Sequence, residues 1–173
     1  MLLLGVAGNA QDAAALEQRL DAARQSGDAT NLASMLTADL ELRGAGRMTW
    51  VEENYLRDRA RSAPEIEAAL LALSVQGNAN GVIPRERVIQ SYRVFMKAHP
   101  DKAGDVAPDL ASWKYWGAVP EYQALMKSGV RQQYPSMLAM RAYLRQSADA
   151  RASGSPAEAS RSSGPTPTSL RTP

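Results

Sequence analysis

The stretch that decides the fold is Ala68–Asn80, AALLALSVQGNAN, the longest apolar run away from the termini. Ser62 precedes this run and Glu65 follows Ser62 by three residues. This spacing is the pattern of a capping box at a helix N-terminus. Gly77 can adopt the left-handed conformation that ends many helices. The sequence therefore predicts a helix that opens at Ser62 and ends at Gly77.

The apolar side chains of this helix recur at the spacing expected for one helix face. They are Ile66, Ala69, Leu70 and Leu73. Leu71 and Val75 widen that face. We therefore expect the helix to be buried on two sides.

The end of the helix has an echo at the start of the chain. Residues 71–80 align without gaps with residues 2–11, sharing two Leu, a Val, a Gly, an Asn and an Ala. A looser apolar-x-apolar-x-Gly pattern occurs at residues 40–44 and 113–117. The closing glycines at 8, 44, 77 and 117 are separated by 36, 33 and 40 residues. A recurring unit of roughly this length is typical of two-helix solenoid repeats.

Residues 2–20, LLLGVAGNAQDAAALEQRL, resemble a HEAT-type repeat junction, and the resemblance also covers Ala68–Met96. An apolar helix ends at small residues, turns, and restarts through Asp12 into a helix with Leu16 and Leu20 four apart. The resemblance implies an all-α fold of antiparallel helix pairs, stacked as a short α-α superhelix. HEAT-like repeats are mostly protein-binding scaffolds, and a minority are lyases or other enzymes. Tetratricopeptide repeats share the length, but their Trp-x-x-Leu-Gly pattern does not follow Trp50.

Composition is that of a globular domain: 173 residues, 45% hydrophobic and 22% charged. The formal net charge of +2 is too small to indicate a nucleic-acid partner. The chain has no Cys, which excludes disulfides. It also argues against a structural zinc site, because such sites usually have cysteine ligands. No window contains the ~18 apolar residues needed to span a bilayer.

Helices are predicted over most of the remaining chain, because apolar residues recur at helical spacing and useful alternation with period two is absent. The predicted ranges are 9–25, 28–40, 49–61, 84–98, 108–116, 120–127 and 135–146. Thr49 and Glu52 form a second capping box at the start of one of them, and we expect Asp39 at the solvent edge of another. We expect Leu138 to point inward. These helices form one domain over residues 1–147.

Residues 148–173 differ in composition, being rich in Ser, Pro, Ala and Thr with one large aliphatic residue, Leu170. Such a segment buries too little apolar surface to offset its ordering entropy. We therefore expect a disordered tail, or a linker to a further domain, that is dispensable for folding.

The N-terminus has two interpretations. Met1–Ala10 has the short apolar run and small residues of a signal peptide, but no Lys or Arg precedes the run. Because the same pattern recurs inside the chain, we favour a chain that begins within a repeat. Its uncovered apolar helix would then promote self-association. We favour a soluble cytoplasmic protein, with a periplasmic or exported protein as the alternative if Met1–Ala10 is the remnant of a signal peptide.

No residue is predicted to be catalytic, cofactor-binding or metal-binding. The one histidine, His99, lies at a helix end without a carboxylate or Ser at a telling spacing. Asp101, Asp105 and Asp109 recur every four residues, which does not fit a calcium loop. Capping roles explain Asp105 and Asp109 better.

A basic stretch and an aromatic group are the remaining candidates. The basic stretch, at residues 57–61 and 85–97, has acidic residues between its Arg and Lys, which favours a solvated helix face over a phosphate site. The aromatic candidates for partner binding are Trp113, Tyr115, Trp116 and Tyr122, since Trp and Tyr are enriched in binding hot spots. Trp113 and Trp116 would share one helix side, and the alternative is that they fill the core.

The sequence thus predicts a scaffold that binds a protein or peptide and is not itself an enzyme. A helical accessory or docking domain of a larger, possibly exported enzyme is the alternative.

Overall fold

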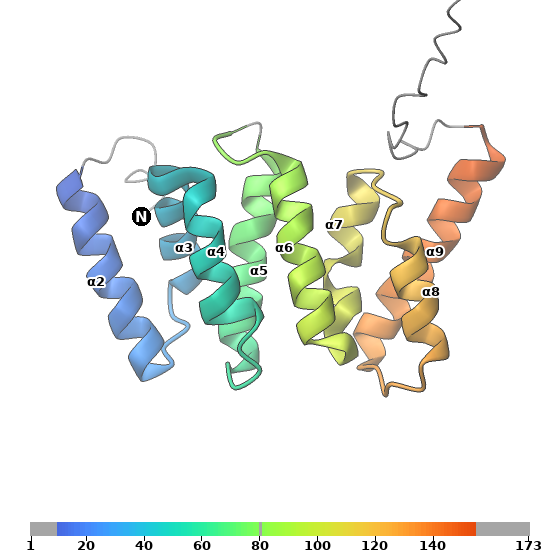
Figure 1. The fold of residues 1–173 in the computed structure, drawn as a ribbon, viewed down its shortest axis with the longest axis horizontal. Helices are drawn as coiled ribbons and strands as arrows, with labels where there is room; N and C mark the ends of the chain where they lie inside the picture. Colours follow the sequence, from blue (N-terminus) through green and yellow to red (C-terminus); the bar gives the residue numbers. More distant parts are fainter. Residues whose placement is uncertain (1–9, 80, 155–173) are drawn as a thin grey trace, which may run out of the picture.

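The computed structural model describes residues 10–79 and 81–154, and within these ranges it is all-α, without strands. The helices follow one another in sequence order from α2 (Ala10–Ser26) at one end to α9 (Tyr134–Ala152) at the other (Figure 1). The predicted fold class, all-α with packed helix pairs, is confirmed. Two predicted segments lie outside the described residues. They are the apolar residues 1–8, interpreted as a signal peptide or as part of a repeat, and most of the predicted tail.

The elements between these ends alternate longer helices with short helical turns. They are α3 (Leu32–Arg43), η1 (Gly44–Arg47), α4 (Met48–Val51), η2 (Glu52–Leu56), α5 (Ala63–Asn78), α6 (Arg85–Ala98), η3 (Pro100–Val106), α7 (Ala107–Ser112) and α8 (Val119–Lys127). Consecutive helices pack as neighbours, α2 on α3, α5 on α6 and α8 on α9. In the view of Figure 1, α4, α6 and α8 lie in front of α3, α5 and α9. Additional contacts of α3 with α5, and of α7 with α9, connect helices of the rear layer.

The start of α5 is the predicted capping box. The carboxylate of Glu65 accepts hydrogen bonds from the backbone N–H and the hydroxyl of Ser62, at 2.9 and 2.8 Å. Arg61 adds an ion pair with Glu65 at 2.9 Å. Although burial alone would raise it, these hydrogen bonds and the Arg61 charge lower the pKa of Glu65 overall. The carboxylate therefore stays ionised and holds the helix start in place.

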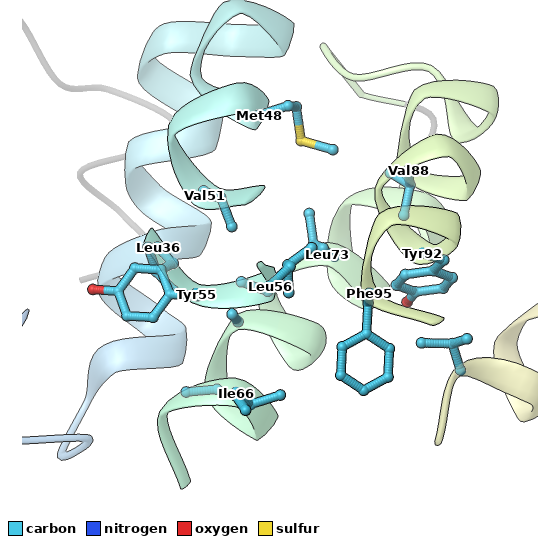
Figure 2. Packing of buried hydrophobic residues seen from close by; sticks show 14 of the residues in the cluster. Leu36, Met48, Val51, Tyr55, Leu56, Ile66, Leu73, Val88, Tyr92 and Phe95 are labelled. Atoms are coloured by element: carbon cyan, nitrogen blue, oxygen red, sulfur yellow. The ribbon is translucent and has the colours of Figure 1, made fainter. Parts of the chain in front are cut away.

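The central helix is buried on fewer sides than predicted. Ile66, Ala69 and Leu73 are buried in the core, where Figure 2 shows Leu73 beside Leu56. Leu71 and Val75, expected to widen the buried face, are instead 57% and 41% exposed. A single helix can be apolar all round by composition, but α5 packs against α3 and α6 and leaves its remaining side to solvent.

Asp39 lies in the core rather than at the solvent edge. Its side chain is fully buried and forms ion pairs with Arg43 at 2.9 Å and with Arg47 at 2.5 Å. Arg43 also reaches Glu17 of α2, at 2.8 Å. A buried carboxylate requires such partners because desolvation penalises an isolated charge. The network fixes α2 and η1 against α3.

The helix predicted to open with the Thr49–Glu52 capping box begins earlier, at Met48, and ends in the wide turn η2 at Leu56. Glu52 is buried and accepts hydrogen bonds from Arg87 at 2.5 Å and Ser91 at 2.6 Å. Thr49 lies inside the helix, whose N-cap is Arg47 without a side-chain cap hydrogen bond, so the predicted capping box does not form. The carboxylate of Glu52 joins η2 to α6 instead.

The last helix is longer than predicted and differently oriented. It continues to Ala152, past the boundary expected at residue 147, and Ser147 is buried. Leu138, expected to point inward, is 44% exposed, whereas Met140 and Tyr143 are buried. Among the described helices, none is long and apolar enough to cross a membrane.

Candidate functional site

A surface hollow of about 560 Å³ lies between α6 and the segment that follows α7. On one side, α6 contributes three charged residues and two neutral ones. On the opposite side lie two aromatic residues with a lysine between them. The lining residues are Arg85, Glu86, Ile89, Gln90, Arg93, Trp113, Lys114 and Tyr115. We call this hollow the aromatic hollow.

Trp113 forms one wall and is held from three directions. Its ring stacks on Tyr92 of α6, with centroids 5.7 Å apart and an interplanar angle of 7°. Its indole N–H donates a hydrogen bond to Oδ1 of Asn78 at 2.9 Å. The third contact is with Gly77, where an added Cβ would lie 2.4 Å from the indole ring.

This contact corrects the role predicted for Gly77. The helix α5 continues through Asn78, and Gly77 does not adopt the left-handed conformation of a helix-ending glycine. Glycine is required here because the Trp113 ring occupies the space of a side chain. The pattern that indicated a helix end thus marks a close approach between α5 and the wall of the hollow.

Tyr92 connects the wall to α7. Its hydroxyl donates a short hydrogen bond to the carboxylate of Asp109. Burial, followed by the neighbouring carboxylate, raises the pKa of Tyr92 far above its ordinary value. The phenol therefore remains protonated, and it remains a donor, throughout the physiological pH range.

Trp113 and Trp116 do not share a helix side, because α7 ends at Ser112. Lys114 adopts a left-handed conformation with φ 54°, which turns the chain between the two tryptophans. Trp116 consequently packs on Tyr143 of α9, with ring centroids 5.2 Å apart. It belongs to the junction with the last helix pair and does not line the hollow.

Tyr122 also lies away from the hollow. Its side chain is fully buried, packs edge-on against Tyr143 at 5.0 Å, and donates a hydrogen bond to the Ala103 carbonyl at 3.1 Å. Of the four aromatic candidates, Trp113 and Tyr115 line the hollow, Trp116 is half-buried against the core beside α9, and Tyr122 is buried in that core.

The arginines of α6 contact the aromatic walls. The Arg85 guanidinium lies 5.4 Å from the centroid of the Trp113 ring, and its Nε donates to the Gly77 carbonyl at 2.8 Å. The Arg93 guanidinium lies 5.9 Å from the centroid of Tyr115. Such cation–π contacts favour defined side-chain positions.

A second hollow, of about 450 Å³, adjoins the first between α6 and α8. Met96, Ala124 and Leu125 provide apolar lining, and we call it the apolar hollow. Its other lining residues are Arg93, Lys97, Glu121 and Ser128. Arg93 lines both hollows and lies 3.3 Å from Glu121 of α8. The two hollows therefore adjoin at Arg93, and we call the pair the groove along α6.

Two of the four aromatic candidates line this groove. Arg85 and Arg93 are exposed, as expected for a solvated helix face, and they also line the groove beside Trp113 and Tyr115. Their spacing of eight residues, about two helical turns, is a signal that they share one side of α6. Nothing local in the sequence brings that side opposite residues 113–115.

His99 does not belong to the groove. It is 5% exposed, stacks on Phe95 at 5.1 Å, and hydrogen-bonds the Leu56 backbone, while its Nε2 has no partner among the described residues. Burial lowers the pKa of His99 below its ordinary value. In residues 10–79 and 81–154, no three His, Asp or Glu side chains cluster in a way that could hold a metal ion.

No family model matches the chain, and neither the curated proteins nor the solved structures contain a significant match to it. The geometry of the groove is therefore the basis for a functional conclusion.

Proposed function

We propose that the chain is a HEAT-like helical-repeat scaffold, without catalytic activity of its own, that binds a protein or peptide partner in the groove along α6. The observation that carries the proposal is that the aromatic and apolar hollows adjoin at Arg93. Two adjoining hollows can contact several consecutive side chains of a partner, whereas an isolated pocket contacts one.

The lining of the groove suits binding to a polypeptide. Trp, Tyr and Arg are the residue types that contribute most to protein interfaces. Trp113 is fixed by Tyr92, Asn78 and Gly77 before any partner arrives. A wall that is already ordered loses little conformational entropy on association, which favours affinity.

The arrangement of helices supports the same proposal. Consecutive helix pairs stack in order, which is the architecture that repeat proteins use to present extended binding surfaces. In this arrangement α6 and α8, which both line the apolar hollow, belong to neighbouring pairs, and Figure 1 shows both helices in front.

The test is selection from an unbiased peptide library displayed on phage, using the full chain as bait. Ala124 is exposed on α8 and lines the apolar hollow, so Ala124→Arg should fill it without disturbing the core. Gln123→Arg, at the neighbouring exposed position outside the groove, is the matched control. We expect selected peptides to bind Ala124→Arg at least tenfold more weakly than wild type and to bind Gln123→Arg unchanged.

Equal binding of the selected peptides to all three proteins would refute the groove as the binding site, and so would the absence of any selected peptide. Thermal melting of both variants confirms that they are folded.

A further inference from the structure

The charges of the groove are unequal along its length. Arg85, Arg93 and Lys114 line the aromatic hollow with Glu86 as its one carboxylate, and Arg93 also pairs with Glu121 of α8 at 3.3 Å. Within the described residues, neither Arg85 nor Lys114 forms an ion pair with a carboxylate. The aromatic hollow is therefore a site of excess positive charge on rigid aromatic walls.

The apolar hollow offers different chemistry at the other end of the same groove. Its lining is mostly apolar, and the apolar residues are Met96, Ala124 and Leu125. A space of this kind suits one or two aliphatic side chains, because desolvating apolar surface is favourable.

We infer that the ligand of this groove is a short, extended acidic peptide whose carboxylates contact Arg85, Arg93 and Lys114 while a nearby aliphatic side chain fills the apolar hollow. This inference rests on the proposed peptide-binding function and specifies its ligand. The positive charge of the aromatic hollow favours the acidic end of the peptide, and the apolar hollow favours the end with the aliphatic side chain.

The separation of the two ends sets the spacing of the motif. The α6 residues of the aromatic hollow centre near Ile89 and those of the apolar hollow near Arg93 to Lys97. About six or seven residues of helix separate the two centres, which is about 10 Å at the helical rise of about 1.5 Å per residue. An extended peptide advances about 3.3 Å per residue, so it crosses this distance in about three residues.

A peptide fits the groove better than a nucleic acid does. Aromatic walls with cations also suit stacked bases. Glu86 and Glu121, however, line the groove and would repel a uniformly anionic backbone. The apolar hollow includes Lys97 and Ser128 in its lining, but most of its surface is apolar and is poorly suited to a phosphate or a sugar. A peptide can place its carboxylates at one end only, which avoids both penalties.

The experiment uses fluorescein-labelled, end-capped peptides on the full chain, with binding measured by fluorescence anisotropy. Each peptide has two adjacent glutamates and two adjacent leucines separated by one to six Gly or Ser residues, in both orders along the chain. We expect the tightest binding when the centres of the two pairs are about three to four residues apart. Replacing either the leucines or the glutamates by serine should weaken binding at least tenfold.

Variants of the chain identify the contacts. Arg93→Gln combined with Lys114→Gln should weaken the best peptide at least tenfold and reduce the salt dependence of its affinity. The control combines Lys127→Gln and Arg145→Gln, which remove the same charge from exposed positions outside the groove and should leave affinity unchanged. A 12-mer of deoxythymidine, labelled in the same way, is the nucleic-acid probe.

The inference is overturned if affinity does not depend on the leucines, if no separation is preferred, or if the oligonucleotide binds more tightly with the same dependence on Arg93 and Lys114. If library selection yields neutral or basic peptides that depend on Ala124, the peptide-binding proposal survives and the acidic motif does not. If neither acidic nor selected peptides bind in the groove, both proposals are wrong.

Discussion

Replacing Gly77 by alanine tests the contact on which the wall of the groove depends. The new Cβ would lie 2.4 Å from two ring atoms of Trp113, well inside van der Waals contact. Those atoms belong to a rigid indole that Tyr92 stacks against and Asn78 hydrogen-bonds. The ring must therefore pivot out of its position, or α5 must move.

The size of the effect follows from opposing contributions. Alanine is favoured over glycine inside a helix by about 1 kcal/mol. Overpacking of this kind costs about 1–3 kcal/mol. If the ring pivots away instead, the aromatic pair with Tyr92 and the indole hydrogen bond are lost, at about 0.5–1.5 kcal/mol each. We expect Gly77→Ala to destabilise the protein by up to about 2 kcal/mol after the helical gain is subtracted.

Two measurements are needed. Urea unfolding gives the change in the free energy of unfolding, and two-dimensional NMR of the tryptophan indole N–H groups reports on Trp113 directly. The indole signal of Trp113 should shift because its hydrogen bond to Asn78 is altered. Affinity for groove-dependent peptides should fall with it.

The control is Gly46→Ala. Gly46 lies in a turn with ordinary backbone angles, and no atom lies within 4 Å of an added Cβ. We expect a change within about 0.5 kcal/mol at such a surface position. A helical glycine with free space around it would gain about 1 kcal/mol on replacement by alanine. The reasoning is refuted if Gly77→Ala stabilises the protein by this amount and leaves the Trp113 indole signal unshifted.

Two further predictions concern the core. Leu73→Ala should destabilise the protein by about 2–5 kcal/mol because Leu73 is fully buried, whereas Leu71→Ala, two residues away and 57% exposed, should cost less than about 1 kcal/mol in urea unfolding; similar losses for the two would contradict the assigned face. Burial lowers the pKa of His99 in the folded protein, so the unfolded chain binds the proton more readily, and the free energy of unfolding should fall as pH drops below about 6.5. His99→Gln should flatten that dependence in urea unfolding at several pH values between about 7 and 5, and identical pH profiles would show that His99 does not contribute.

Local signals in the sequence were sufficient for the positions of most helices. The capping box of Ser62 and Glu65 places the start of α5, and Pro100 stops α6 at Ala98, as the avoidance of helical geometry before proline requires. Both signals act between residues a few positions apart. They hold whatever the rest of the chain does, which is why the all-α class and these boundaries could be predicted.

The composition of a helix does not say which of its sides meets another helix. Leu71 and Val75 are as apolar as the buried residues of α5, yet they face solvent, and the charged Asp39 is buried. Burial is decided by neighbours from other parts of the chain. For Asp39, the decisive cations are placed by α3 and by the turn that follows it, with Glu17 contributed from α2.

The sequence by itself determined that the chain forms helices, where several of them begin and end, and that aromatic residues gather near residue 115. Only the tertiary structure decided which of these aromatics line a groove. Trp113 lies beside Gly77 and Arg85 because α5, α6 and the segment after α7 pack together. Contacts between residues about 30 positions apart depend on the packing of whole helices, and such packing minimises exposed apolar surface over the entire molecule rather than within any one segment.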